Sequence, residues 1–191
     1  MKFLHKAVAT GVALLGLSTA SAAPETFTID PSHTYPMFEV SHFGLSVQRG
    51  RFDKTGGKIV LDREARSGSI DVNIDAASIN MGFDAWNKVM TGEDLFNVAK
   101  FPAMTFKSDK LIFDGDKIVG ADGEFTLLGV KKPMHLKVSN FACMQHPMLK
   151  KFVCGAEVSA DIKRSDFGMS TGIPVVGDDI RLISPVEAVK D

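Results

Sequence analysis

The amino-acid sequence predicts an all-β protein in which one antiparallel sheet is either closed on itself as a barrel or folded into a sandwich. Apolar and polar residues alternate with a period of two almost everywhere in the chain, which is the pattern of half-buried strands. Glycine, proline and aspartate separate these segments, as in tight connections between neighbouring strands. One segment alone has helical spacing.

The alternation is clearest in residues 70–75, where Ile70, Val72 and Ile74 alternate with polar side chains, and residues 134–139 repeat it. The same pattern predicts further strands near 27–29, 37–42, 48–52, 57–61, 104–113, 117–128, 155–162 and 180–189. Turns are expected at Thr55-Gly56-Gly57, Asp114-Gly115-Asp116, Asp122-Gly123 and Lys132-Pro133. Many short strands with tight connections favour a single antiparallel sheet.

The helical exception lies between residues 83 and 98. Trp86, Val89 and Met90 have helical spacing, Gly92 interrupts them, and residues 93–96 are typical of a second short helical turn. In an otherwise β chain, such an insertion acts either as a lid over the mouth of a barrel or as a plug for one end of a sandwich.

The first 22 residues have the pattern of a secretory signal peptide, with basic residues before an apolar run and small residues ending at Ala22. The apolar run is too short to cross about 30 Å of hydrocarbon, and no later stretch approaches the ~20 apolar residues of a spanning helix. The sequence therefore predicts an exported, periplasmic protein without a membrane span. Residues 23–191 are expected to form a single domain.

The charge balance argues against a nucleic-acid partner. The chain has 22 basic and 23 acidic side chains, and cleavage after Ala22 removes two lysines and leaves 20 basic side chains against 23. No basic stripe is present to hold phosphates.

The edge strands of such a sheet would allow a homodimer as well as a monomer.

Catalytic motifs are absent from the sequence. There is no Gly-x-Ser-x-Gly elbow, and Asp166-Phe167-Gly168 lacks the other kinase motifs, so it is interpreted as a turn. Gly57-Lys58 resembles the end of a phosphate loop, but Phe52 stands where the first glycine belongs and Ile59 where Ser or Thr belongs. No enzyme, catalytic residue or cofactor is predicted.

Two cysteines, Cys143 and Cys154, follow the signal peptide, and an oxidising compartment favours a disulfide between them over two free buried thiols. A metal site is the alternative use, because soft sulfur and imidazole suit copper. A bridge would remove both thiolates, and no CxxC or HExxH spacing supports a site. The residues in question are His135, Cys143, Met144, His146, Met148 and Cys154.

The apolar content is large for one small β domain, with 14 Phe and 9 Met in the chain. An eight-stranded barrel has an interior that is either filled by side chains or wide enough for one small ligand. Met and aromatic residues suit a packed core and a ligand pocket alike. Composition alone leaves both interpretations open.

Longer motifs resemble the YceI family of exported proteins. The opening is carried by Phe27-Thr-Ile-Asp30-Pro-Ser-His33-Thr, Phe38-Glu-Val-Ser-His42-Phe-Gly44 and Arg49-Gly-Arg-Phe52. The later matches are Leu95-Phe-Asn-Val-Ala-Lys-Phe101-Pro102-Ala-Met-Thr-Phe106, Gly123-Glu-Phe-Thr-Leu-Leu-Gly129-Val-Lys-Lys-Pro133 and Ile162-Lys-Arg164-Ser-Asp166-Phe-Gly168. They occur in the family's order from Phe27 to about Ala188.

The resemblance implies an extended, lipocalin-like, eight-stranded antiparallel barrel. Its apolar tunnel would bind a polyisoprenoid, such as an isoprenoid quinone or a polyprenyl phosphate, or another long amphiphile, and no catalytic activity is implied. The hairpin that carries Cys143 and Cys154 resembles a subset of the family with a disulfide there, which strengthens that prediction.

Candidate ligand-binding residues follow from inward-facing positions of this barrel. In the strand that ends at His42, Phe38, Val40 and His42 share one face. His42 is then either a polar group for a head group or a structural histidine bonded to a backbone carbonyl. The candidate tunnel lining comprises Phe38, Val40, His42, Phe52, Ile74, Trp86, Met90, Phe96, Phe101, Met104 and Phe106.

One segment departs from the family pattern. Many relatives have Arg-Asp-x-His-Leu where this chain has Trp86-Asn87-Lys88-Val89-Met90, and fewer charged groups there favour a quinone head over a pyrophosphate. The predicted function is a periplasmic binding or carrier protein for a polyisoprenoid amphiphile. The alternatives are a stress or redox accessory protein that acts through a bound quinone or handles metal.

Overall fold

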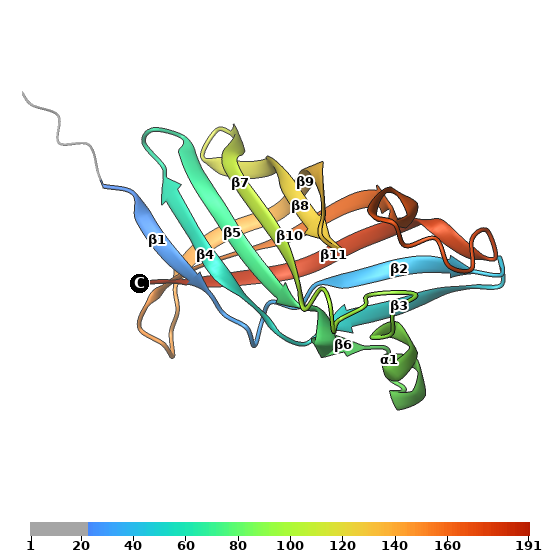
Figure 1. Cartoon of the computed structure of the whole chain (residues 1–191). Helices are drawn as coiled ribbons and strands as arrows, with labels where there is room; N and C mark the ends of the chain where they lie inside the picture. Colours follow the sequence, from blue (N-terminus) through green and yellow to red (C-terminus); the bar gives the residue numbers. More distant parts are fainter. Residues whose placement is uncertain (1–22) are drawn as a thin grey trace, which may run out of the picture.

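A computed structural model describes residues 23–191, so the predicted signal peptide lies outside the described residues. Eleven strands and one short α-helix form the fold (Figure 1). The strands are β1 (Glu25–Ile29), β2 (Met37–His42), β3 (Ser46–Phe52), β4 (Thr55–Asp62), β5 (Ser67–Asp75), β6 (Ile79–Asn80), β7 (Ala103–Asp114), β8 (Lys117–Leu127), β9 (Val130–Gln145), β10 (Phe152–Lys163) and β11 (Val176–Lys190). The helix α1 spans Asp84–Met90, and short 3₁₀ turns occupy Ala76–Ser78 and Arg164–Phe167.

Eight of these strands close into an antiparallel barrel, in the order β1-β4-β5-β7-β8-β9-β10-β11 and back to β1. The predicted eight-stranded barrel is therefore confirmed, and the sandwich alternative is wrong. The long strand β11 makes the closure possible because its C-terminal end pairs with β1 while its N-terminal half pairs with β2. From β2 the sheet continues through β3 to β6, which lengthens one end of the barrel (Figure 1).

Alternation along the strands points apolar side chains into the barrel, as predicted for Ile70, Val72 and Ile74. In β9 the inward series changes from even to odd positions between Val138 and Phe141. The pairing with β10 shifts by one residue at this point, and Asn140 has a positive φ of 55°. This β-bulge reverses the pleat.

Three of the four predicted turns were wrong, and so was the second helical turn. Thr55-Gly56-Gly57 begins strand β4, and Asp122-Gly123 and Lys132-Pro133 lie inside strands β8 and β9. The connection between β8 and β9 is instead the pair Leu128-Gly129. Both residues of that pair have positive φ, as a two-residue hairpin requires. Residues 93–96 form hydrogen-bonded turns rather than a second helical segment.

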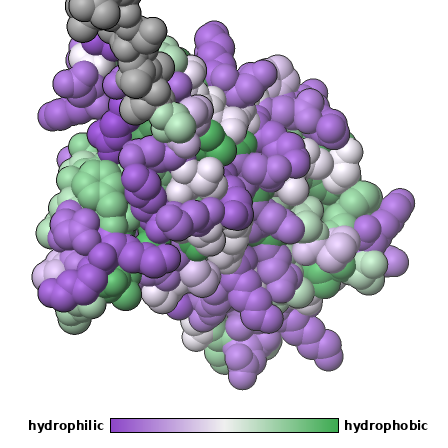
Figure 2. All heavy atoms as spheres, turned by 90° about the vertical axis from the view of Figure 1, so that its left-hand side faces the viewer, coloured by the Kyte–Doolittle hydropathy of each residue, from purple (hydrophilic) through white to green (hydrophobic). Residues whose placement is uncertain are grey.

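The two ends of the barrel differ. At one end lie the β2–β3 hairpin, α1 and the segment 168–175, and at the other lie the start of β1 and the end of β11 (Figure 1). Hydrophilic side chains cover most of the second end, with smaller apolar areas between them (Figure 2). We call these the hairpin end and the terminal end.

Candidate functional site

An apolar cavity of about 190 Å³, the inner cavity, lies inside the ring of eight strands. Its wall comes from almost every strand of the barrel, and the polar side chains in it are short hydroxyls. Such a wall offers dispersion contacts but hardly any hydrogen bonds. The lining includes Phe27, Ile29, Ile59, Leu61, Ile70, Val72, Ile74, Phe106, Leu111, Ile118, Met134, Leu136, Val138, Phe141, Val158 and Ala188.

A second cavity of about 450 Å³, the outer cavity, lies toward the hairpin end. Phe38, Val40 and His42 line it from β2, and Trp86 and Met90 line it from α1. Phe83 and Trp86 also remain 60% and 48% exposed, so they stand at an opening to solvent. The helix α1 has no buried residue and borders this mouth, which fits the predicted lid better than a plug.

Four side chains belong to the linings of both cavities and so form the boundary between them: Phe52, Met104, Phe125 and Leu182. Phe52 is fixed by an aromatic cluster, with its ring centroid 5.3 Å from Phe96 and 6.3 Å from Phe38. Met104 is unbranched and adapts easily to a new shape. A chain that occupied both cavities would have to displace side chains at this boundary.

The polar side chains of the outer cavity are few: His42, Gln48, Arg164 and Thr171. The His42 ring lies 4.6 Å from the Phe43 ring and 6.3 Å from the Trp86 ring, measured between centroids. These contacts are with aromatic rings rather than with a backbone carbonyl. His42 is a half-exposed polar group in the lining of the outer cavity, and its role toward a head group stays a prediction.

Arg164 is only 4% exposed and organises the backbone beside the mouth. Its Nε donates to the Gly177 carbonyl, Nη1 to Met169 and Thr171, and Nη2 to Val176, at 2.8–3.1 Å. Burial lowers the pKa of Arg164 from its ordinary value, and the negative charge of Asp178 partly opposes that shift. Four of the five guanidinium N–H groups are thereby committed to carbonyls.

Thr55 is a feature that the sequence reasoning did not single out. It lines the inner cavity and is 5% exposed, and its Oγ1 has no hydrogen-bond partner among the described residues. A buried hydroxyl without a partner is unfavourable. Nothing in the sequence marks it, because Thr55 lies beside two glycines and resembles a turn residue.

The structure brings ten of the eleven candidate lining residues to the cavities. Phe38, Val40, His42, Trp86, Met90 and Phe96 line the outer cavity, Ile74 and Phe106 line the inner cavity, and Phe52 and Met104 line both. Phe101 lines neither, so its inward placement was wrong. Its ring covers Gly129, where an added Cβ would lie 2.9 Å from Phe101 Cε1.

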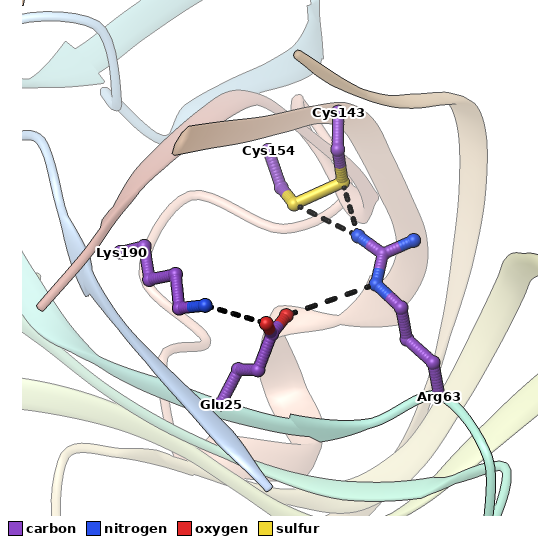
Figure 3. Close-up of a disulfide and its surroundings, with 5 residues drawn as sticks. All are labelled: Glu25, Arg63, Cys143, Cys154 and Lys190. Carbon is purple, nitrogen blue, oxygen red and sulfur yellow. Dashed lines mark hydrogen bonds and ion pairs between the residues drawn. A yellow bond between two sulfur atoms is a disulfide. The ribbon is translucent and has the colours of Figure 1, made fainter. Parts of the chain in front are cut away.

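At the terminal end, a disulfide and an ion-pair network lie within the ring of strands (Figure 3). Cys143 of β9 and Cys154 of β10 are bridged, as predicted. Arg63 Nη2 lies 2.8 Å from Cys143 Sγ, and Glu25 accepts from Lys190 Nζ at 2.6 Å and pairs with Arg63 at 3.9 Å. These contacts tie the start of β1, the β4–β5 turn and the end of β11 together.

The bridge removes both thiols from the metal site considered for residues 135–154, and His135 instead bonds Asp122 at 2.7 Å. In the described part of the chain, one other group has the donors for a metal: Asp30, His33 and Glu187 have potential ligand atoms within 4.8 Å of one another. The Asp30 backbone N–H donates to the Glu187 carbonyl at 2.9 Å, which attaches the β1–β2 loop to β11. The Asp30 carboxylate accepts a hydrogen bond from Ser32 Oγ and a second from His33 Nδ1. Together these two bonds lower the pKa of Asp30 to about 2.

The sequence matches the family model described as a YceI-like domain over residues 27–188. The chain belongs to the YceI family. A protein named YceI from Salmonella arizonae is 30% identical over 182 residues, covering 94% of each chain. A UPF0312 protein from Shewanella denitrificans is 29% identical over 181 residues, again with 94% of each chain covered.

Three solved structures of similar proteins have the same fold. The Campylobacter jejuni YceI protein is 29% identical with a TM-score of 0.67, covering 79% of this chain and 90% of that one. Burkholderia cenocepacia BcnA gives a TM-score of 0.72 at 22% identity, covering 83% and 98%. A polyisoprenoid binding domain from Saccharophagus degradans gives 0.66 at 19% identity, covering 86% and 98%.

Proposed function

We propose that this YceI-family barrel is a periplasmic binding or carrier protein for a polyisoprenoid amphiphile. The single observation that carries the proposal is the pair of adjacent apolar cavities, which extend from the ring of strands to an open mouth. The description of the Saccharophagus degradans domain as polyisoprenoid binding agrees with this ligand class. No catalytic step is part of the proposal.

The isoprenoid tail would occupy the inner cavity. A polyprenyl chain has no hydrogen-bonding groups, so its affinity comes from removing apolar area from water, at about 25 cal/mol per Å², and is reduced by the cost of ordering the chain. A wall such as that formed by Ile74, Phe106 and Val138 supplies this contact without leaving buried polar groups unpaired. The tail would pass the boundary by displacing Met104 and Phe52.

The head group would lie in the outer cavity, where His42, Gln48 and Trp86 stand near the mouth. Arg164 is the one cationic side chain in the lining of this cavity. It has a single N–H group left after its four bonds to carbonyls, whereas a bidentate phosphate contact needs two. This geometry supports a head of low charge, such as a quinone, over a phosphate.

Native mass spectrometry of protein exported to a periplasm and purified without detergent tests the proposal. We expect a co-purifying adduct of several hundred daltons that organic extraction identifies as a quinone or polyprenyl species. A bare polypeptide that also fails to bind added isoprenoids would overturn the carrier function, and the cavities would then be imperfections of a packed core.

A competition between a quinone and a polyprenyl phosphate of equal chain length tests the head-group assignment separately. We expect tighter binding of the quinone. Preference for the phosphate would show that Arg164 exchanges a carbonyl partner for the ligand, and the assignment of a low-charge head would be wrong.

A further inference from the structure

The hairpin end carries exposed apolar side chains from three separate segments. The β2–β3 hairpin contributes Phe43, Leu45 and Val47, α1 and its N-cap contribute Phe83, Trp86 and Val89, and the segment before β11 contributes Val175. Leu45 is 87% exposed, the most of any large hydrophobic residue among those described. We call these seven residues the apolar rim.

The rim is one continuous surface, because its three segments contact one another. The Phe43 backbone N–H donates to the Val175 carbonyl at 2.8 Å, which joins the hairpin to the segment 168–175. His42 stacks edge-on against both Phe43 and Trp86, which joins the hairpin to α1. Contiguous exposed apolar surface of this kind marks an interaction site.

The helix α1 and its N-cap leave three apolar side chains exposed. Phe83, Trp86 and Val89 recur every three residues, so they lie along one side of the helix, and no residue of α1 is buried. An amphipathic helix normally turns such a stripe toward its own core. Here the stripe is left for something outside the barrel.

Two of the segments beside the rim carry no charge. Residues 43–48 and 168–177 contain no charged side chain, whereas the turn 62–66 at the terminal end has four charged residues out of five. The four bonds from Arg164 hold the uncharged segment 168–177 in place beside the mouth. The two uncharged segments fit an apolar phase, while the exposed Asp84 and Lys88 of α1 can remain in the polar head-group layer.

The rim also borders the cavity. Phe83 and Trp86 both line the outer cavity and stand exposed on the rim, so apolar surface runs without interruption from the outside into the barrel. A long isoprenoid that entered through water would expose its whole tail, at a cost proportional to its apolar area. Entry from an apolar phase pressed against the rim avoids that exposure.

We propose that the apolar rim docks onto a lipid bilayer, so that the cavity mouth opens directly into the membrane interface. Tryptophan and leucine partition into this interface, and binding by apolar insertion depends little on anionic lipid. No helix in the described part of the chain is long and apolar enough to cross a membrane. The transfer role of this contact rests on the proposed function, but the docking itself does not require a bound ligand.

Trp86 is the only tryptophan of the chain and stands on the rim, so it reports docking directly. With phosphatidylcholine vesicles that contain no isoprenoid, we expect co-sedimentation, a blue shift of Trp86 fluorescence and quenching by brominated acyl chains. Adding phosphatidylglycerol or salt should change the affinity little. Binding that requires phosphatidylglycerol and disappears in salt, or unquenched Trp86, would overturn the proposal.

Leu45→Ser tests the rim without touching either cavity lining. Removing one leucine from an apolar contact should weaken vesicle binding about tenfold. The matched control is Met148→Ser, at an 81% exposed site in the β9–β10 turn, which should leave vesicle binding unchanged. Equal vesicle binding by wild type and Leu45→Ser, or equal loss in both variants, would contradict docking through the rim.

Two further measurements separate the competing explanations. Sedimentation velocity without vesicles tests whether the rim is instead a contact between two copies; a dimer that Leu45→Ser dissociates, with no vesicle binding, would overturn membrane docking. Native mass spectrometry with added geranylgeraniol and no vesicles tests the cavity alone. Geranylgeraniol binding without vesicle binding would refute docking and leave the proposed function standing, whereas the reverse would refute the carrier function and leave docking standing.

Discussion

The two ends of the barrel are built on opposite principles. The terminal end is linked by a disulfide and ion pairs, with the Cys143–Cys154 bridge beside Arg63 and Glu25 (Figure 3). The hairpin end is open and has an exposed apolar rim beside two uncharged segments, 43–48 and 168–177. The strand β11 extends from the hairpin end, where it pairs with β2, to the terminal end, where it pairs with β1. The comparison shows that the same strands can be cross-linked at one end of a barrel and leave an accessible cavity mouth at the other.

The boundary between the cavities gives the largest expected effect. Phe52→Ala removes a buried ring and should destabilise the fold by about 3–5 kcal/mol, while joining the inner and outer cavities. Phe106→Ala is the matched control, because Phe106 lines the inner cavity alone. We expect both variants to lose stability in urea, and only Phe52→Ala to gain affinity for a longer isoprenoid relative to a shorter one. An equal gain in both variants would show that the boundary does not limit the ligand.

Removing the bridge tests how far the terminal end is independent of the hairpin end. The double variant Cys143→Ala with Cys154→Ala opens a link between residues 11 apart, which should cost roughly 3 kcal/mol or less. Thermal unfolding measures the loss, and vesicle binding should stay unchanged. A loss of vesicle binding would mean that the two ends are coupled through the strands.

Acid should loosen the β1–β2 loop, because the Asp30 carboxylate bonds Ser32 and His33 within it. The hydrogen bonds from Ser32 and His33 lower the pKa of Asp30 from 3.8 to about 2, so its contribution to stability is present above the ordinary value and is lost as pH falls toward 2. The shift corresponds to a contribution on the order of 2 kcal/mol. Urea unfolding at several pH values should show this loss in wild type and not in Asp30→Asn.

At higher pH, the stability contribution of His33 changes with pH in the opposite direction to that of Asp30. The hydrogen bond to Asp30 raises the pKa of His33 above 6.5, so this contribution is present below 6.5 and disappears as pH rises through the raised value. The control is Asp71→Asn, because the exposed pair of Asp71 with Lys107 should contribute little. An unchanged acid limb in Asp30→Asn would refute the role of Asp30.

The smallest expected effect concerns Thr55. Replacing its unpaired hydroxyl by a methyl group in Thr55→Val should stabilise the protein by about 1 kcal/mol, because a buried hydroxyl without a partner is unfavourable. Thr34→Val is the contrast, since the Thr34 hydroxyl both donates to and accepts from the Glu187 backbone, and it should destabilise. Thermal unfolding without ligand measures both variants, and a destabilised Thr55→Val would show that this hydroxyl has a partner, such as a buried water.

Much of this arrangement could be predicted from the sequence. The period of two identified the inward residues of β5 and β9, helical spacing located α1, and the bridge followed from two cysteines after a signal-like segment. Nine of the ten candidate lining residues that reach a cavity lie in strands or in α1, where spacing sets the direction of the side chain. Phe96 and Phe101 lie in the loop before β7, where side-chain direction does not follow a regular repeat, and only Phe96 lines a cavity.

Local pattern by itself determined which residues alternate, where the chain is helical and which residue types fill the interior, because these depend on spacing within a few residues. Tertiary structure alone decided the bulge at Asn140, the four carbonyls around Arg164, the unpaired hydroxyl of Thr55 and the division into two cavities. Each of these depends on which segments distant in sequence face one another. Strand register and barrel closure fix that pairing, and neither can be predicted from the local alternation of apolar and polar residues.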